Sequence, residues 1–153
     1  MKDKIILFFA TGAYVGYSPR APGTLGTLWG VLIVLGLSRA GAAAFGLAAA
    51  AVTALAVYIA GEAARLMDAK DPKAVVIDEV AGMMVASFLL PLGIKAVILA
   101  FLLFRFFDIL KPWPVNYIDG AVGGGAGIVL DDVAAGVYAN IGARIIAGVL
   151  GWA

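Results

Sequence analysis

The sequence predicts an all-α fold: one compact domain of residues 1–153, built as a multi-helix bundle embedded in a membrane. Apolar residues make up 63% of the chain and charged residues only 14%, whereas a soluble domain is about half apolar and about a quarter charged. The chain also contains 20 glycines, and small residues let membrane helices approach closely. We therefore expect short helices, rich in Gly and Ala, that pack tightly together.

Prolines, glycines and charges divide the chain into apolar stretches: 5–17, 24–38, 42–60, 80–94, 96–104 and 133–153. Of these, 42–60 comes nearest to the roughly 20 residues that cross a bilayer as a helix. The segment SPRAPGT, residues 18–24, contains two prolines and a glycine and cannot lie inside a helix. We expect 5–17 to enter the membrane and return through this turn, as a re-entrant N-terminal segment.

The positions of Lys and Arg predict the orientation in the membrane. If the N-terminal segment re-enters and the later helices cross in order, two basic residues, Arg39 and Lys95, lie on one side. The eight on the other side are Lys2, Lys4, Arg20, Arg65, Lys70, Lys73, Arg105 and Lys111. The positive-inside rule places the larger group in the cytoplasm. The same arrangement puts five acidic residues at cytoplasmic helix ends: Asp78, Glu79, Asp108, Asp131 and Asp132.

The N-terminus and the composition add further expectations. Residues 1–17 have the basic start and apolar run of a signal peptide but no convincing cleavage site, so we expect them to remain. The net charge of +1 gives no indication of nucleic-acid binding. The chain has no Cys and no His, which leaves carboxylates as the main acid–base and metal-binding groups. Oxygen ligands favour Mg²⁺ or Mn²⁺.

Two similar acidic pairs stand out. IDEVAG contains Asp78 and Glu79, and LDDVAAG contains Asp131 and Asp132. Helix neighbours diverge by about 100°, so one carboxylate of a pair can point inward while the other points sideways. Carboxylates near a helix start also cap its free N–H groups, which is the simpler interpretation of one pair. Two such pairs in an apolar chain favour a metal site.

Basic residues and turns supply candidate phosphate ligands. In FRFFDILKPWP, Arg105, Asp108 and Lys111 form a stripe along one helical face. The stripe is either an Arg–Asp pair at a helix end, or an anion site in which Asp108 orients Arg105 or joins the metal shell. The turn that carries Ser18, Arg20 and Thr24 can also hold phosphate.

Three other segments receive simpler interpretations. We expect the glycine-rich run 119–127 to be a flexible or close-packing connector. The charged segment 61–74 is expected to be a solvated turn. Asn140 and Arg144 are polar residues of an apolar helix with no obvious partner, and Arg144 can extend to the membrane interface.

Four motifs occur in a characteristic order: SPRAPGTLGTL, IDEVAG, FRFFDILKPWP and LDDVAAG. Together, over residues 12–136, they resemble the bacterial phosphatidylglycerophosphatase A family. Thr27 stands where a serine is more usual in that family, and the change keeps a hydroxyl. The resemblance implies a multi-pass protein of the bacterial inner membrane with its site facing the cytoplasm. Its reaction would be the Mg²⁺-dependent removal of the phosphate monoester from phosphatidylglycerophosphate, a phospholipid substrate in the bilayer.

The residues and the resemblance together assign roles as follows. Glu79, Asp131 and Asp132 would hold one or two Mg²⁺, with Asp78 as a further ligand or base. Arg105 and Lys111 would bind the phosphate, and Arg20 and the turn from Ser18 to Thr24 would help them. Either water or an aspartate attacks phosphorus. The sequence leaves the oligomeric state open.

Two other function classes remain at this point. Carboxylates in apolar helices also occur along ion pathways, so an ion-coupled transporter is one alternative. A phosphatase that acts on a different lipid phosphate is the other.

Overall fold

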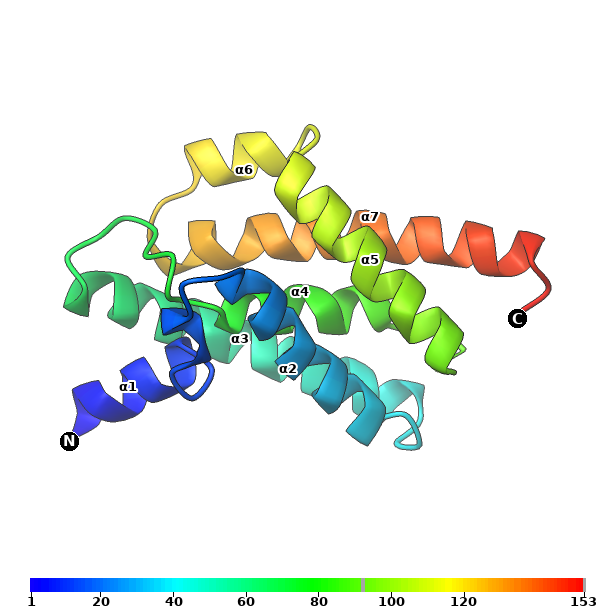
Figure 1. Cartoon of the computed structure of the whole chain (residues 1–153), viewed down its shortest axis with the longest axis horizontal. Helices are drawn as coiled ribbons and strands as arrows, with labels where there is room; N and C mark the ends of the chain where they lie inside the picture. Colours follow the sequence, from blue (N-terminus) through cyan, green and yellow to red (C-terminus); the bar gives the residue numbers. More distant parts are fainter. Residues whose placement is uncertain (92, 153) are drawn as a thin grey trace.

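The fold is known from a computed structural model, which describes residues 1–91 and 93–152 (Figure 1). All regular secondary structure in these two ranges is helical, as predicted. In chain order the elements are α1 (Lys2–Ala10), a 3₁₀ turn η1 (Val15–Tyr17), α2 (Pro22–Gly36), α3 (Ala42–Leu66), α4 (Ile77–Ser87), α5 (Ile94–Leu110), α6 (Val115–Ala121) and α7 (Gly124–Val149).

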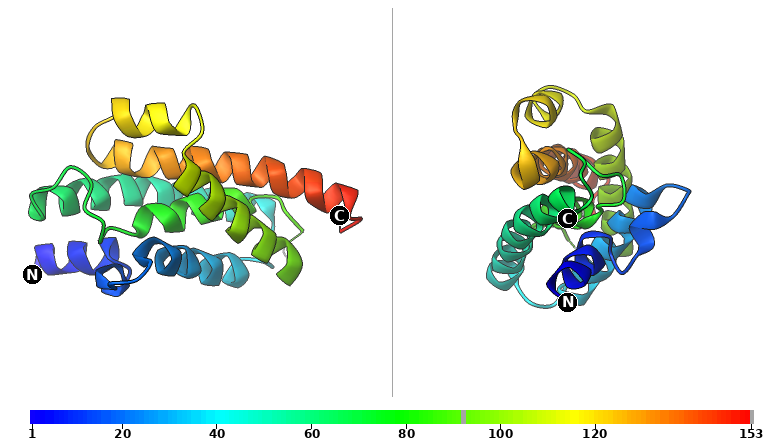
Figure 2. Two further views of the ribbon diagram at one scale, coloured as in Figure 1. Left: turned by 45° about the horizontal axis from the view of Figure 1, so that its top comes forward. Right: turned by 90° about the vertical axis from the view of Figure 1, so that its left-hand side faces the viewer.

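The short helix α4 lies at the centre of the bundle. Seven of its 11 residues are buried, and it packs against α2, α3, α5 and α7. The long helix α7 runs beside it and also contacts α3, α5 and α6. In the end-on view, α6 and α7 lie on the opposite side of the bundle from α1 (Figure 2). The central helix is therefore enclosed by elements from both halves of the chain.

Helices α4 and α7 approach most closely where two glycines meet. A Cβ added to Gly136 would lie 2.5 Å from the carbonyl oxygen of Gly82. One added to Gly82 would lie 2.5 Å from the Phe104 ring and 2.8 Å from the carbonyl oxygen of Asp132. Such distances are shorter than a van der Waals contact. The expected packing through small residues is therefore present at this crossing.

The C-terminal end of α4 receives its hydrogen bonds from α7. The Asn140 side-chain amide donates to the carbonyl oxygens of Ala86 (3.0 Å) and Phe88 (2.7 Å). Arg144 donates to the Phe88 oxygen at 2.9 Å and to Asn140 at 2.8 Å. These donors satisfy carbonyls that a helix end leaves free. Asn140 and Arg144, for which the sequence offered no obvious partner, therefore have partners at the end of α4.

Two segments that were predicted as connectors are partly helical. Residues 119–121 end α6 and residues 124–127 begin α7, so only residues 122 and 123 of the glycine-rich run connect the two helices. Gly125 packs directly against Gly61 and the Val57 carbonyl of α3, and this close contact compensates for the low helix propensity of glycine. The segment 61–74 is helical as far as Leu66, because α3 continues past the apolar stretch.

Among the described residues, α3 is the one helix that is both long and apolar enough to span a membrane, and only 17% of its most apolar window is buried. Large apolar side chains are also exposed elsewhere, such as Ile109 and Val149 at 73% and 83%. Exposed apolar surface of this kind suits a lipid environment. The structure thus shows an all-helical bundle with one candidate membrane span.

The glycine contact between α4 and α7 can be tested with two substitutions in the same helix. Gly136→Ala places a methyl group against the backbone of Gly82, which cannot rotate away. We expect it to lower the free energy of unfolding by about 1–3 kcal/mol and the thermal midpoint in detergent by several degrees. Gly148→Ala is the matched control, because nothing lies within 4 Å of the added Cβ. Equal midpoints for the two variants would contradict the close contact.

Candidate active site

Three carboxylates from two helices converge beside the α4–α7 contact. Asp78 and Glu79 lie in the first turn of α4, and Asp132 lies on α7 one turn before Gly136. One oxygen from each of the three lies within 4.8 Å of the others. Asp78 Oδ1, Glu79 Oε2 and Asp132 Oδ2 are buried and have no hydrogen-bond partner. Three close carboxylates with unsatisfied oxygens are the ligand set that a hard divalent cation takes.

Helix capping does not explain both acidic pairs. Helix α7 begins at Gly124, so Asp131 and Asp132 are its eighth and ninth residues, well inside the helix. The prediction that all five acids lie at helix ends is therefore wrong for this pair. Asp78 and Glu79 do lie in a first turn, where the helix dipole favours negative charge, but no side-chain cap closes the N-terminus of α4. The carboxylates point instead into the site.

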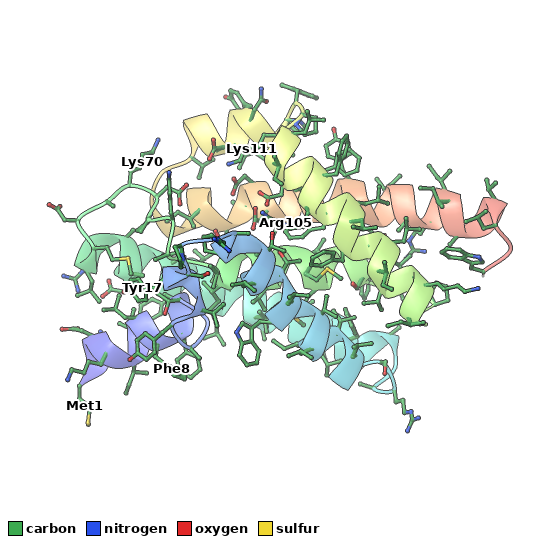
Figure 3. All side chains as sticks on the ribbon, in the orientation of Figure 1. Met1, Phe8, Tyr17, Lys70, Arg105 and Lys111 are labelled. Atoms are coloured by element: carbon green, nitrogen blue, oxygen red, sulfur yellow. The ribbon has the colours of Figure 1, made fainter. Side chains whose placement is uncertain are left out.

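Arg105 links the carboxylates to α5. Its Nη1 lies 2.5 Å from Asp108 Oδ2 and 3.8 Å from Glu79 Oε1. All three side chains are less than 20% exposed, at 17%, 14% and 13% for Arg105, Asp108 and Glu79. The i,i+3 pair predicted from the sequence is thus formed, and it orients the guanidinium toward α4. Figure 3 shows Arg105 between α5 and the start of α2.

The N-terminus of α2 lies against this arginine. A Cβ on Gly23 would collide with Glu79 Oε1 and lie 3.1 Å from the two terminal nitrogens of Arg105. Only a glycine therefore fits this position without displacing the ion pair. Pro22 opens α2, and the first-turn N–H groups of a helix have no partner within it. Gly23 was not singled out from the sequence, although the Pro-Gly start of a helix indicates close backbone approach.

The other predicted residues of this turn, Ser18, Arg20 and Thr24, are less closely associated with the three carboxylates than Gly23 is. The Ser18 hydroxyl donates to the Arg20 carbonyl oxygen at 3.0 Å, so the turn closes on itself. The Arg20 side chain is exposed. Thr24 follows Gly23 in the first turn of α2 and is partly buried. The turn thus adjoins the carboxylates through Gly23.

Asp131 is not part of the three-carboxylate cluster, and its side chain contacts Lys111. Lys111 Nζ lies 2.7 Å from Asp131 Oδ2 and 2.8 Å from Asp119 Oδ1. Burial lowers the pKa of Lys111, but hydrogen bonds to Asp119 and Asp131 outweigh this effect, so the pKa is raised and the ammonium stays charged. Asp119 could not be identified from the sequence, because its position opposite Lys111 depends on how α6 folds back over α7.

The chain matches the phosphatidylglycerophosphatase A family over residues 8–147. It is 38% identical over 138 residues to phosphatidylglycerophosphatase A of Haemophilus influenzae, covering 89% of this chain and 85% of that protein. It is 33% identical over 129 residues to the Escherichia coli protein of the same name, covering 84% and 75%.

A Bacteroides thetaiotaomicron protein, named as a candidate phosphatidylinositol-3-phosphatase, is 35% identical over 152 residues and 95% of each chain. No solved structure shows significant similarity to this chain. The family match extends over nearly all of the chain and includes every residue of the three-carboxylate cluster. The chain therefore belongs to the phosphatidylglycerophosphatase A family.

Proposed function

We propose that this chain hydrolyses the phosphate monoester of phosphatidylglycerophosphate to phosphatidylglycerol and inorganic phosphate, with Mg²⁺ or Mn²⁺ as cofactor. The observation that carries the proposal is the cluster of Asp78, Glu79 and Asp132, with its unpartnered buried oxygens, beside the Arg105 guanidinium. Two relatives named phosphatidylglycerophosphatase A support the substrate. Family membership does not support the transporter alternative.

The three carboxylates fit a hard cation by chemistry and by spacing. One oxygen of each is buried and without a hydrogen-bond donor, and Arg105 compensates their mutual repulsion only in part, through Glu79. A bound Mg²⁺ supplies the Lewis acidity that phosphoryl transfer requires. Asp131 was also predicted as a ligand. In the structure one of its oxygens accepts from Lys111 while Oδ1 is free, so we place it at the edge of the metal site.

Arg105 and the start of α2 form the phosphate-binding side of the site. Asp108 holds the guanidinium of Arg105 in place, and planar N–H donors suit phosphate oxygens. The N–H groups of the first turn of α2, at Gly23 and Thr24, add donors at a helix N-terminus. Lys111, which contacts Asp131 of α7, binds the phosphate from that side of the site. Ser18 and Arg20 form the outer edge of the site.

The reaction that we propose is direct attack by water. The water oxygen forms a bond to phosphorus as the bond between phosphorus and the glycerol oxygen breaks. A carboxylate of the cluster accepts a proton from the water and passes it to the glycerol oxygen as that oxygen leaves, so that the products are the glycerol hydroxyl and hydrogen phosphate. Inversion of configuration at a chirally labelled phosphorus supports this path, whereas retention of configuration or a trapped phosphorylated aspartate would support the covalent one.

We also propose that the chain is a multi-pass protein of the inner membrane with the site at the cytoplasmic headgroup level. The apolar helix α3 and the exposed apolar side chains support an embedded bundle. The uneven distribution of Lys and Arg supports the orientation. A site at this level lets the lipid tails stay in the bilayer while the phosphate reaches the carboxylates.

A second candidate substrate is a phosphoinositide. The Bacteroides relative aligns with 95% of both chains, more than either phosphatidylglycerophosphatase A relative does. Both reactions cleave a phosphate monoester, so the same cluster could serve either. Phosphate release by the purified protein from phosphatidylglycerophosphate and from phosphatidylinositol 3-phosphate, compared as kcat/KM, decides between them. We expect the first lipid to be preferred by at least about tenfold, which corresponds to about 1.4 kcal/mol.

Removing metal ligands should abolish activity. We expect Glu79→Gln and Asp132→Asn each to lower kcat/KM by about 100-fold or more, because loss of a carboxylate weakens metal binding and leaves the phosphoryl charge uncompensated. EDTA should stop the wild type and added Mg²⁺ should restore it. Asp68→Asn is the control: Asp68 is exposed with a positive φ of 49°, which asparagine tolerates. Wild-type rates in both site variants would refute the metal assignment.

The planar shape of Arg105 can be tested separately from its charge. Arg105→Lys keeps the positive charge but loses the fork that contacts Asp108 and the bound phosphate. We expect kcat/KM for phosphatidylglycerophosphate to fall by about 10- to 100-fold, a loss typical of removing a charged hydrogen bond. Arg65→Lys, at an exposed surface pair, should retain wild-type kinetics. A KM and a kcat in Arg105→Lys equal to those of the wild type would show that charge alone suffices.

A further inference from the structure

Lys111 is held between two carboxylates that come from different helices. Asp131, on α7, is almost fully buried at 6% exposure, whereas Asp119, on α6, is 43% exposed. The ammonium lies 2.7 Å from the first and 2.8 Å from the second. Asp119 is not part of the three-carboxylate cluster. Figure 3 shows Lys111 close to the end of α5, where the chain turns into α6.

Hydrogen bonding holds the backbone of Lys111 in place, but it does not determine where the side-chain ammonium lies. The Lys111 N–H donates to the Phe107 carbonyl at 2.9 Å and closes the last turn of α5. The next turn is closed by Val115, which donates to the Pro112 carbonyl at 2.7 Å. The four-carbon side chain beyond this anchor keeps its rotational freedom. The position of the ammonium therefore depends on its two acceptors.

Two acceptors determine the direction of the third donor. An ammonium has three N–H groups arranged tetrahedrally, and Asp119 and Asp131 take two of them. The direction of the third N–H of Lys111 is then fixed by the tetrahedral geometry. With Asp131 alone, the ammonium can rotate, and it can also move inward, because Asp131 Oδ1 is buried and has no partner. Asp119 thus keeps the ammonium at the outer side of Asp131.

The exposed ion pair between Lys111 and Asp119 is unsuited to a purely stabilising role. An ion pair with a partner that is 43% exposed adds little to stability, because water screens it. Helix α6 is held on α7 independently, through the buried side chain of Val115 and its packing against α7. Asp119 also lines a small hollow of about 20 Å³ with Lys70, Asp71 and the start of α7. It therefore faces the charged surface outside the site.

We propose that Asp119 is a positioning residue that, together with Asp131, aims the free N–H of Lys111 at the substrate phosphate. The inference rests on the proposed function, because it requires that Lys111 bind phosphate. Asp119 itself does not touch the substrate. Helix α6 has a defined part in this arrangement: it carries the outer carboxylate across the end of α5.

The experiment compares the kinetics of three variants with phosphatidylglycerophosphate and Mg²⁺ in detergent. In Asp119→Asn we expect KM to rise by about three- to tenfold, the range for one misdirected charged hydrogen bond, with a smaller change in kcat. Asp119→Glu keeps the carboxylate and should return KM toward the wild-type value. Asp71→Asn removes a charge from the same hollow without touching Lys111, and should leave KM and kcat at wild-type values.

A second measurement needs no substrate. Labelling of Lys111 by an amine-reactive reagent should be several-fold faster in Asp119→Asn than in the wild type, because the ammonium has lost one partner. Unchanged labelling, or an unchanged or lowered KM in Asp119→Asn, overturns the positioning role. Wild-type protein that releases no phosphate with Mg²⁺ overturns the proposed function itself, while faster labelling would still establish the bridge.

Discussion

The architecture of the site depends on how closely α4 approaches α7. Gly82 and Gly136 let the two backbones touch, and the carboxylates lie one turn away from these glycines on each helix. A side chain at either glycine would separate the helices and move Asp132 away from Asp78 and Glu79. The close packing of these two glycines therefore sets the spacing of the three carboxylates.

Charge balance explains the rest of the arrangement. In the described part of the chain, six carboxylates gather around two cations that form ion pairs, Arg105 and Lys111. The six are Asp78, Glu79, Asp108, Asp119, Asp131 and Asp132. The cations divide the acids into two groups: Arg105 contacts Glu79 and Asp108, and Lys111 contacts Asp119 and Asp131. The unpartnered oxygens then fall mainly on Asp78, Glu79 and Asp132. A divalent cation would add the positive charge that this cluster lacks.

Much of the site could be expected from local patterns. The i,i+3 spacing of Arg105 and Asp108 predicts their contact, and the divergence of helix neighbours predicts that Asp131 and Asp132 face different partners. The start of α7 could not be predicted, because helix propensity penalises glycines that here pack against α3. Partners far apart in the sequence, such as Asp119 with Lys111 or Arg144 with Phe88, depend on tertiary contacts. The roles of these residues in catalysis stay predictions.

The hydrogen bonds from Asn140 and Arg144 to the end of α4 have a consequence for biosynthesis. Helix α7 leaves the ribosome after helices α1–α6, yet it supplies both these donors and Asp132. Until it emerges, the nascent chain has an α4 with unsatisfied carbonyls at one end and two carboxylates without their third partner at the other. The three carboxylates of the candidate metal site therefore come together only after α7 has been translated.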